Sequence, residues 1–153
     1  MRSIRRLALV SVAAALLAVV AFSSTVAAAS PRHGELHATK ECSQYHGQPG
    51  EFCTFTSSNL RALKVGSRII YASAAGATSL DTDVLIDAGH GSTASGHCVL
   101  DFATGLGACS FWKGTGRFSG FSASVVVSYL GGPNWAWDGT YGFHRHGCRG
   151  RHR

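Results

Sequence analysis

Short apolar runs rich in β-branched and aromatic residues recur along the chain, and Gly, Asn, Ser and Asp separate them. Turn-forming residues between such runs are typical of antiparallel β structure. Beyond residue 29 no stretch shows a sustained apolar period of 3.6 residues, so helices are not expected. The pattern predicts an all-β sandwich or barrel with strands at 52–57, 67–73, 82–87, 97–102, 108–112, 121–130 and 135–143.

Apolar and polar residues alternate within several of these runs. Between residues 121 and 130 the odd positions through Tyr129 are apolar, whereas Ser122, Ser124 and Ser128 occupy even positions. A period of two residues with one apolar face is what an antiparallel sheet with one solvated side requires. We therefore expect one face of each strand to build a core.

Residues 1–29 have the organisation of a secretory signal peptide. A basic segment, MRSIRR, precedes the apolar run LALVSVAAALLAVVAF, and the small residues TVAAA follow. We expect cleavage near Ala29–Ser30 and a secreted, extracellular protein, whose only membrane contact is this cleaved segment. The alternative is a retained membrane anchor, because the apolar run approaches the roughly 20 residues that span a bilayer.

Basic residues are concentrated at the two ends of the chain. The formal net charge of +6 includes three arginines of the signal peptide and four in the last ten residues. Residues 30–143 hold seven basic and eight acidic residues, a net charge of −1. A nucleic-acid-binding domain would carry a clustered basic excess, so we expect no nucleic-acid partner. The polar, aperiodic segment 30–48 predicts a flexible arm, followed by one domain at 49–143 and a basic tail at 144–153.

Five cysteines in an exported chain predict disulfides. We predict the local pairs Cys42–Cys53 and Cys98–Cys109. A hairpin folded about residues 103–105 sets Cys98 opposite Cys109, within disulfide reach. The body has no C-x-x-C spacing, which disfavours a zinc site. The remaining cysteine, Cys148, is expected to be free or bridged to a second chain.

The stretch GTGRFSGF, residues 114–121, has the appearance of a phosphate-binding loop. Its spacing is G-x-G-x-x-x-G, no G-K-[ST] is present, and the valine-rich run that follows is a poor helix former. We therefore interpret it as a turn between two strands, in which Gly114 and Gly116 supply positive φ and Phe118 enters the core.

GTGRFSGF, followed by a Val-rich strand and by WDGTYGF, resembles the barrel of the allene oxide cyclase-like family and the related dirigent proteins. The similarity extends over 41–143 and includes GEFCTFTSSNL, VGSRIIYA, LDTDVLID and GHCVLDFATGLGACSF, as in small secreted bacterial proteins with this domain. The resemblance implies an eight-stranded antiparallel calycin-like barrel with an apolar cavity. It also implies binding of hydrophobic substrates without a metal or organic cofactor, and assembly into dimers or trimers.

Catalytic residues do not carry over from this family, and no catalytic residue is assigned. Glu51 and Asn59 share residue types with the cyclase site and nothing more. Aromatic residues of the strands either fill the barrel or line a pocket for an apolar ligand. Asn59 is a polar anchor in that pocket or, alternatively, a turn or capping residue. The candidate pocket residues are Asn59, Tyr71, Trp112, Phe118, Trp137 and Tyr141.

Two further groups of residues carry possible chemistry. Asp81 and Asp83, two apart on a predicted strand, share a face and could hold a proton or a cation, or be solvated turn residues. In the tail, His144, His146 and Cys148 are weak candidates for a metal site, against the alternative of a basic tail with no ligand.

Two hypotheses of function follow. The first is a secreted barrel that binds a small hydrophobic molecule, with cofactor-free isomerase or cyclase activity as its enzymatic form. The second is a non-enzymatic extracellular binding or structural module that contacts a cell surface through the barrel exterior or the tail. An open cavity with a convergent polar group would favour the first hypothesis, and a barrel filled by side chains would remove it.

Overall fold

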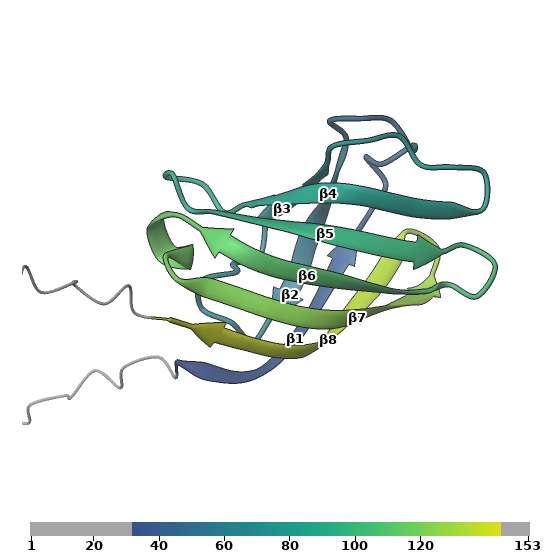
Figure 1. The fold of residues 1–153 in the computed structure, drawn as a ribbon. Coiled ribbons are helices and arrows are strands. Elements are labelled where there is room, and N and C mark those ends of the chain that lie inside the picture. Colours follow the sequence, from purple (N-terminus) through teal and green to yellow (C-terminus); the bar gives the residue numbers. More distant parts are fainter. Residues whose placement is uncertain (1–31, 145–153) are drawn as a thin grey trace, which may run out of the picture.

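The computed structural model describes residues 32–144, which form one closed barrel of eight antiparallel strands in sequence order (Figure 1). A single 3-10 turn, η1 (Gly116–Phe118), precedes the seventh strand. This confirms the predicted all-β fold and the eight-stranded antiparallel barrel. The strands are β1 (His33–Glu41), β2 (Phe52–Ser58), β3 (Arg68–Tyr71), β4 (Ser79–Asp87), β5 (Thr93–Asp101), β6 (Leu106–Gly114), β7 (Phe121–Gly131) and β8 (Asn134–Phe143).

Seven of these strands, β2 to β8, correspond to the seven predicted runs, but the prediction of a flexible arm at 30–48 is wrong. Residues His33–Glu41 are β1, which pairs with β2 on one side and with β8 on the other and so closes the barrel. Leu36, Ala38 and Lys40 of this strand are its buried positions. The apolar alternation of β1 is incomplete, because a lysine occupies its third inward position, and the strand was therefore not predicted.

The two ends of the barrel differ. The described chain begins and finishes at one end, here called the terminal end, on the left in Figure 1. The loops 59–67, 88–92 and 115–120 belong to this end. The opposite end, here called the mouth, carries the loops that join β1 to β2, β3 to β4, β5 to β6 and β7 to β8.

Aromatic side chains fill the middle of the barrel. The ring of Trp137 lies 5.0 Å from that of Phe55 and 5.5 Å from that of Phe111, centroid to centroid. Toward the terminal end, Phe118 of η1 is fully buried and its ring lies 5.1 Å from that of Phe121. Such pairs add about 0.5–1.5 kcal/mol beyond the burial of their area. The core therefore fills the barrel interior at its centre and toward the terminal end.

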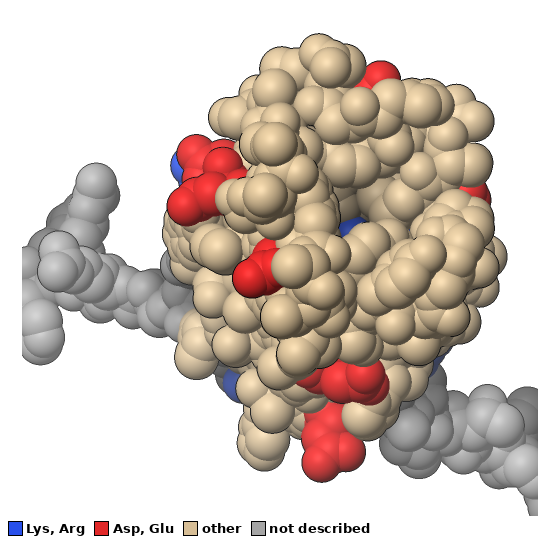
Figure 2. Space-filling view, turned by 90° about the vertical axis from the view of Figure 1, so that its right-hand side faces the viewer, with Lys and Arg blue, Asp and Glu red and all other residues tan. Residues whose placement is uncertain are grey.

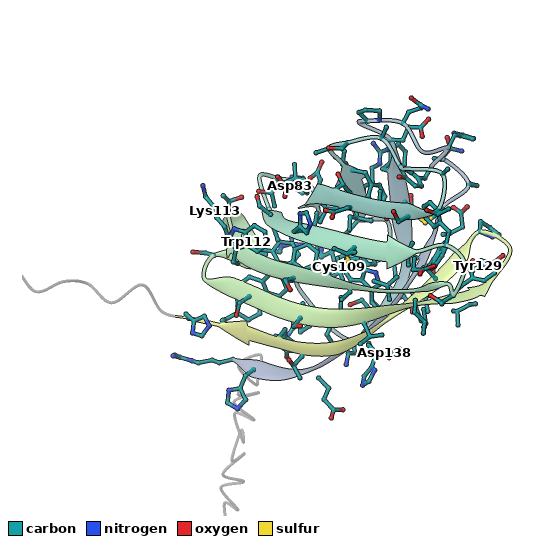
Figure 3. All side chains as sticks on the ribbon, turned by 45° about the vertical axis from the view of Figure 1, so that its right-hand side comes forward. Asp83, Cys109, Trp112, Lys113, Tyr129 and Asp138 are labelled. Carbon is teal, nitrogen blue, oxygen red and sulfur yellow. A yellow bond between two sulfur atoms is a disulfide. The ribbon has the colours of Figure 1, made fainter. Side chains whose placement is uncertain are left out.

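Both predicted disulfides are present, Cys42–Cys53 and Cys98–Cys109. Cys98 and Cys109 are directly paired in the β5–β6 register, as the hairpin geometry predicted, and Figure 3 labels Cys109 in the middle of β6. The other bridge ties the loop after β1 to the start of β2. Two disulfides are typical of an oxidising environment.

The segment GTGRFSGF joins β6 to β7 through η1, as expected of a turn between strands. Gly116 has a φ of 55°, which confirms its predicted role, whereas Gly114 does not have a positive φ. Gly114 is required for a different reason, because a Cβ at this position would collide with the backbone carbonyl of Phe118. The loop thus folds tightly enough to bring Phe118 back over the core.

Candidate binding site in the mouth of the barrel

A cavity of about 470 Å³ enters the barrel from the mouth. Figure 2 looks onto this end and shows the hollow, with a basic side chain visible at its bottom. The volume is within the range of small-molecule sites, and it is the opening that the first hypothesis requires. The lining residues are Lys40, Cys42, Tyr45, His46, Gly47, Gln48, Tyr71, Ala75, Gly76, Leu80, Leu100, Phe102, Gly132, Pro133 and Trp135.

Among the residues that the structure describes, Lys40 is the only lysine or arginine that lines this cavity. The alternation of β1 turns its side chain into the barrel, where the residue is 5 % exposed. Its Nζ donates a hydrogen bond to Tyr71 Oη at 2.5 Å. The same nitrogen lies 5.3 Å from the centroid of the Tyr71 ring and 5.4 Å from that of Trp137. A primary amine is therefore held between two aromatic rings under the cavity.

Lys40 has no carboxylate partner among the ion pairs of the described residues. Burial disfavours the charged form of an amine, and here it lowers the pKa of Lys40 from 10.5 to about 7. Burial also raises the pKa of Tyr71 above its usual range, so the phenol stays protonated. The site therefore combines an amine that is partly uncharged at neutral pH with a neutral hydroxyl.

One wall of the cavity is built by the loop between β1 and β2. Tyr45 of this loop packs on Tyr71, with ring centroids 4.4 Å apart, and Cys53 Sγ lies 3.3 Å from Tyr71 Oη. Glu51 accepts hydrogen bonds from the backbone N–H groups of His46 and Gln48. These two bonds lower the pKa of Glu51 and keep the loop in a compact turn. The carboxylate thus shapes the rim of the cavity and does not enter it.

Of the six predicted pocket residues, Tyr71 alone lines the mouth cavity. Trp137 is 1 % exposed and lies beneath it, against Lys40 and the central aromatic residues. Phe118 is in the core near the terminal end. The structure therefore brings Tyr71 and Trp137 together around Lys40 and places Phe118 elsewhere.

The other three candidates do not line the mouth cavity: Asn59 and Trp112 are exposed on the outside of the barrel, and Tyr141 packs against the core. Asn59 accepts a hydrogen bond from the His37 N–H and donates one to the Glu35 carbonyl, which is the alternative turn role. Trp112 is 59 % exposed over a shallow groove that it shares with Asp83 (Figure 3). Tyr141 is half-buried, with its ring 5.9 Å from that of Phe143. A role of these residues in ligand binding stays a prediction.

Sequence reasoning missed Lys40, Tyr45 and most of the residues that form the cavity wall. One signal was available for Lys40, since it follows Leu36 and Ala38 at intervals of two. A lysine in phase with apolar residues on a strand marks an inward-facing amine. The residues of the loops carry no such signal, because their positions depend on the fold.

Asp81 and Asp83 share a face, as predicted, and hold His97 of β5 between them. Asp81 Oδ1 and Asp83 Oδ1 each lie 2.9 Å from one ring nitrogen of His97. These hydrogen bonds, that of Asp83 above all, raise the pKa of His97. Both aspartates are exposed and His97 is half-buried, so the cluster is a feature of the solvated surface.

The predicted tail site falls mostly outside the described residues. His146 and Cys148 lie there, and only His144 is placed, 3.1 Å from Ser122 Oγ through its Nε2. Within residues 32–144 no group of three or more His, Cys, Asp or Glu side chains is arranged to hold a metal ion. In the same range no helix is long and apolar enough to span a membrane.

Comparison of the chain with protein-family models, with curated proteins and with solved structures finds no match.

Proposed function

We propose that this protein binds a small apolar molecule in the mouth cavity, with Lys40 and Tyr71 as its polar anchors. The observation that carries the proposal is a concave site whose lining includes Leu80, Leu100 and Trp135, with the Lys40 amine hydrogen-bonded to the Tyr71 hydroxyl at its base. Ligand sites typically combine an apolar lining with a few placed polar groups. The resemblance to the allene oxide cyclase-like family supports a ligand of this kind. Cyclase or isomerase activity would require in addition that the walls fold a substrate into a reactive shape.

Two fluorescent probes test the proposal, the uncharged N-phenyl-1-naphthylamine and the anionic 1-anilinonaphthalene-8-sulfonate. Both probes are expected to bind the wild type. Ala75→Trp places an indole in the cavity and is expected to weaken both probes by at least about tenfold, which corresponds to about 1.4 kcal/mol. Ala103→Trp, in an exposed mouth loop outside the lining, is the matched control and should leave both affinities unchanged.

Because the two probes differ in charge, they distinguish binding in the cavity from the contribution of the Lys40 amine. Lys40→Met is expected to weaken the anionic probe by about tenfold and to leave the uncharged probe bound. Binding that is equally strong in wild type and Ala75→Trp would place the probes elsewhere and contradict the proposal.

A second candidate function, contact with a negatively charged membrane surface, is favoured by the distribution of charge. Among the described residues, six of the seven lysines and arginines belong to the terminal end, and the seventh is Lys40. Figure 2 shows the opposite face, where acidic side chains predominate. A hollow of about 530 Å³ at the terminal end is lined by Arg32, Leu60, Arg61, Ala62, Lys64, Arg117 and Phe143.

Basic residues near an anionic lipid surface contribute about 1 kcal/mol each. We therefore expect the protein to bind vesicles that contain phosphatidylglycerol, and not vesicles of phosphatidylcholine, in a cosedimentation assay at low salt. The triple variant Arg61→Ser, Lys64→Ser, Arg117→Ser should lose at least about tenfold in affinity. Equal binding of the variant, or binding that salt does not weaken, would remove this candidate.

A further inference from the structure

We propose that Lys40 is a nucleophile that captures apolar aldehydes as Schiff bases inside the mouth cavity. The inference rests on the proposed function, because the aldehyde reaches Lys40 through the same cavity. It goes further by naming a chemical class of ligand and a covalent bond to one atom, Lys40 Nζ.

The first argument is the position of the amine. Lys40 is on β1 with Phe55 of β2 and Trp135 of β8 as its strand neighbours, so its side chain is held on both sides. The amine lines the cavity and is otherwise enclosed by the rings of Tyr71 and Trp137. An apolar molecule with one polar end, entering the cavity with that end first, therefore brings its polar group to Nζ.

The second argument is the absence of a counter-ion among the described residues. The titratable groups that share this site with Lys40 are Tyr71 from β3 and Tyr45 and His46 from the β1–β2 loop. Neither β2 nor β8 contributes a carboxylate, and the Cys42–Cys53 bridge does not titrate. With burial unopposed, the pKa of Lys40 falls to about 7, so part of the amine carries a free lone pair at neutral pH.

The third argument is that this amine is costly to bury and makes only one hydrogen bond within the described residues. Its single hydrogen bond is to Tyr71, and it makes no ion pair within residues 32–144. A buried amine without a counter-ion is destabilising, whereas a side chain such as Met would fill the same space without a charge. Strained or costly groups of this kind concentrate at functional sites.

The chemistry is a condensation that needs no oxidant or reductant. The Nζ lone pair attacks the carbonyl carbon, a C–N bond forms, and the C=O π electrons move to the oxygen, which takes up a proton. The carbinolamine then loses its hydroxyl group and one N–H proton as water, which leaves a C=N bond. Tyr71 is assigned as a positioning residue, because its neutral hydroxyl contacts Nζ and orients the lone pair.

Reductive trapping tests the inference. The disulfide-intact protein is incubated at pH 7 with n-decanal and sodium cyanoborohydride, which reduces an imine to a stable secondary amine. Peptide mapping by mass spectrometry then locates the decyl adducts. The chain has only three lysines, Lys40, Lys64 and Lys113, and the other two provide internal comparisons. The α-amino group is scored in its own peptide.

Lys40 is expected to carry at least about tenfold more adduct than Lys64 or Lys113. A lysine with an ordinary pKa near 10.4 is uncharged in only about one molecule in several thousand at pH 7. Ala75→Trp should reduce the adduct on Lys40 and leave those on Lys64 and Lys113 unchanged. Tyr71→Phe should slow adduct formation at Lys40 while the near-UV circular dichroism spectrum stays native, a split that loss of folding would not produce.

Two results separate this inference from the proposed function. If N-phenyl-1-naphthylamine binds in the cavity but Lys40 gains no more adduct than the other lysines, the Schiff base is wrong and the binding function stands. If the uncharged probe does not bind and Lys40 is not selectively modified, both proposals fail. Selective modification that Ala75→Trp does not reduce would also overturn the inference, because the aldehyde would not be using the cavity.

Discussion

Lys40→Met is expected to stabilise the protein by about 2–5 kcal/mol at or below pH 7. The pKa of Lys40 is lowered from 10.5 to about 7, and each pKa unit corresponds to about 1.4 kcal/mol. Keeping the charged amine buried therefore costs the folded state up to about 5 kcal/mol. Methionine has a similar length and no charge, so it removes this cost and keeps the packing against Tyr71 and Trp137, while the hydrogen bond to Tyr71 Oη, worth about 1 kcal/mol, is lost.

The gain is expected to shrink as the pH rises. Below the folded-state pKa, Lys40 is protonated in both the folded and the unfolded protein, and the cost is fully present. Between pH 7 and pH 10.5 the folded protein has released the proton and the unfolded chain still binds it, so the wild type gains stability with pH. Urea unfolding of both proteins at pH 6, 7, 8 and 9, with disulfides intact, measures the difference.

The control for this prediction is Lys64→Met, which changes an exposed lysine at the terminal end. Its free energy of unfolding should differ from that of the wild type by less than about 0.5 kcal/mol. A Lys40→Met protein that is less stable than the wild type at every pH would show that the amine supports the fold. Stabilisation with loss of aldehyde capture is the result expected of a residue kept for function at the expense of stability.

Trp137→Ala is expected to destabilise the protein by about 3–5 kcal/mol. The side chain is 1 % exposed and contacts the rings of Phe55 and Phe111 in the middle of the barrel. Removal of the indole leaves a cavity that the surrounding strands, closed into a barrel, have little freedom to collapse. Denaturant unfolding followed by circular dichroism measures the loss without relying on tryptophan fluorescence.

Trp112→Ala is the matched control, since it removes the same side chain from the outer face of the barrel. Trp112 is 59 % exposed, and its loss should change the free energy of unfolding by less than about 0.5 kcal/mol. Similar effects of the two substitutions would contradict the assignment of Trp137 to the core and of Trp112 to the surface.

The strands themselves could be located from the sequence wherever the inward positions are apolar. In β7 the residues Phe121, Ala123, Val125 and Val127 are inward and buried, as the alternation predicted. Two cysteines placed symmetrically about a short turn likewise predicted the β5–β6 register. β1 was not predicted, because the polar Lys40 occupies one of its inward positions and interrupts the apolar alternation.

The candidate site could not be predicted in the same way, because strand periodicity says which face a residue occupies and not what lies opposite. Tyr71 and Trp137 both face inward on predicted strands, yet only the closed barrel shows that they enclose the same amine. Asn59 was a reasonable polar anchor by sequence, but its amide is used by the backbone of β1.

Strands β2 to β8, the two disulfide pairs and the turn at GTGRFSGF follow from the sequence alone, because each depends on local periodicity or on residues close in the chain. Closure of the barrel by β1, and a hollow mouth above a filled centre, emerge only when all eight strands are assembled. The same assembly places the amine of Lys40 against Tyr71, 31 positions away in the sequence. The chemistry of that amine depends on burial, and burial is a property of the closed barrel and not of any one strand.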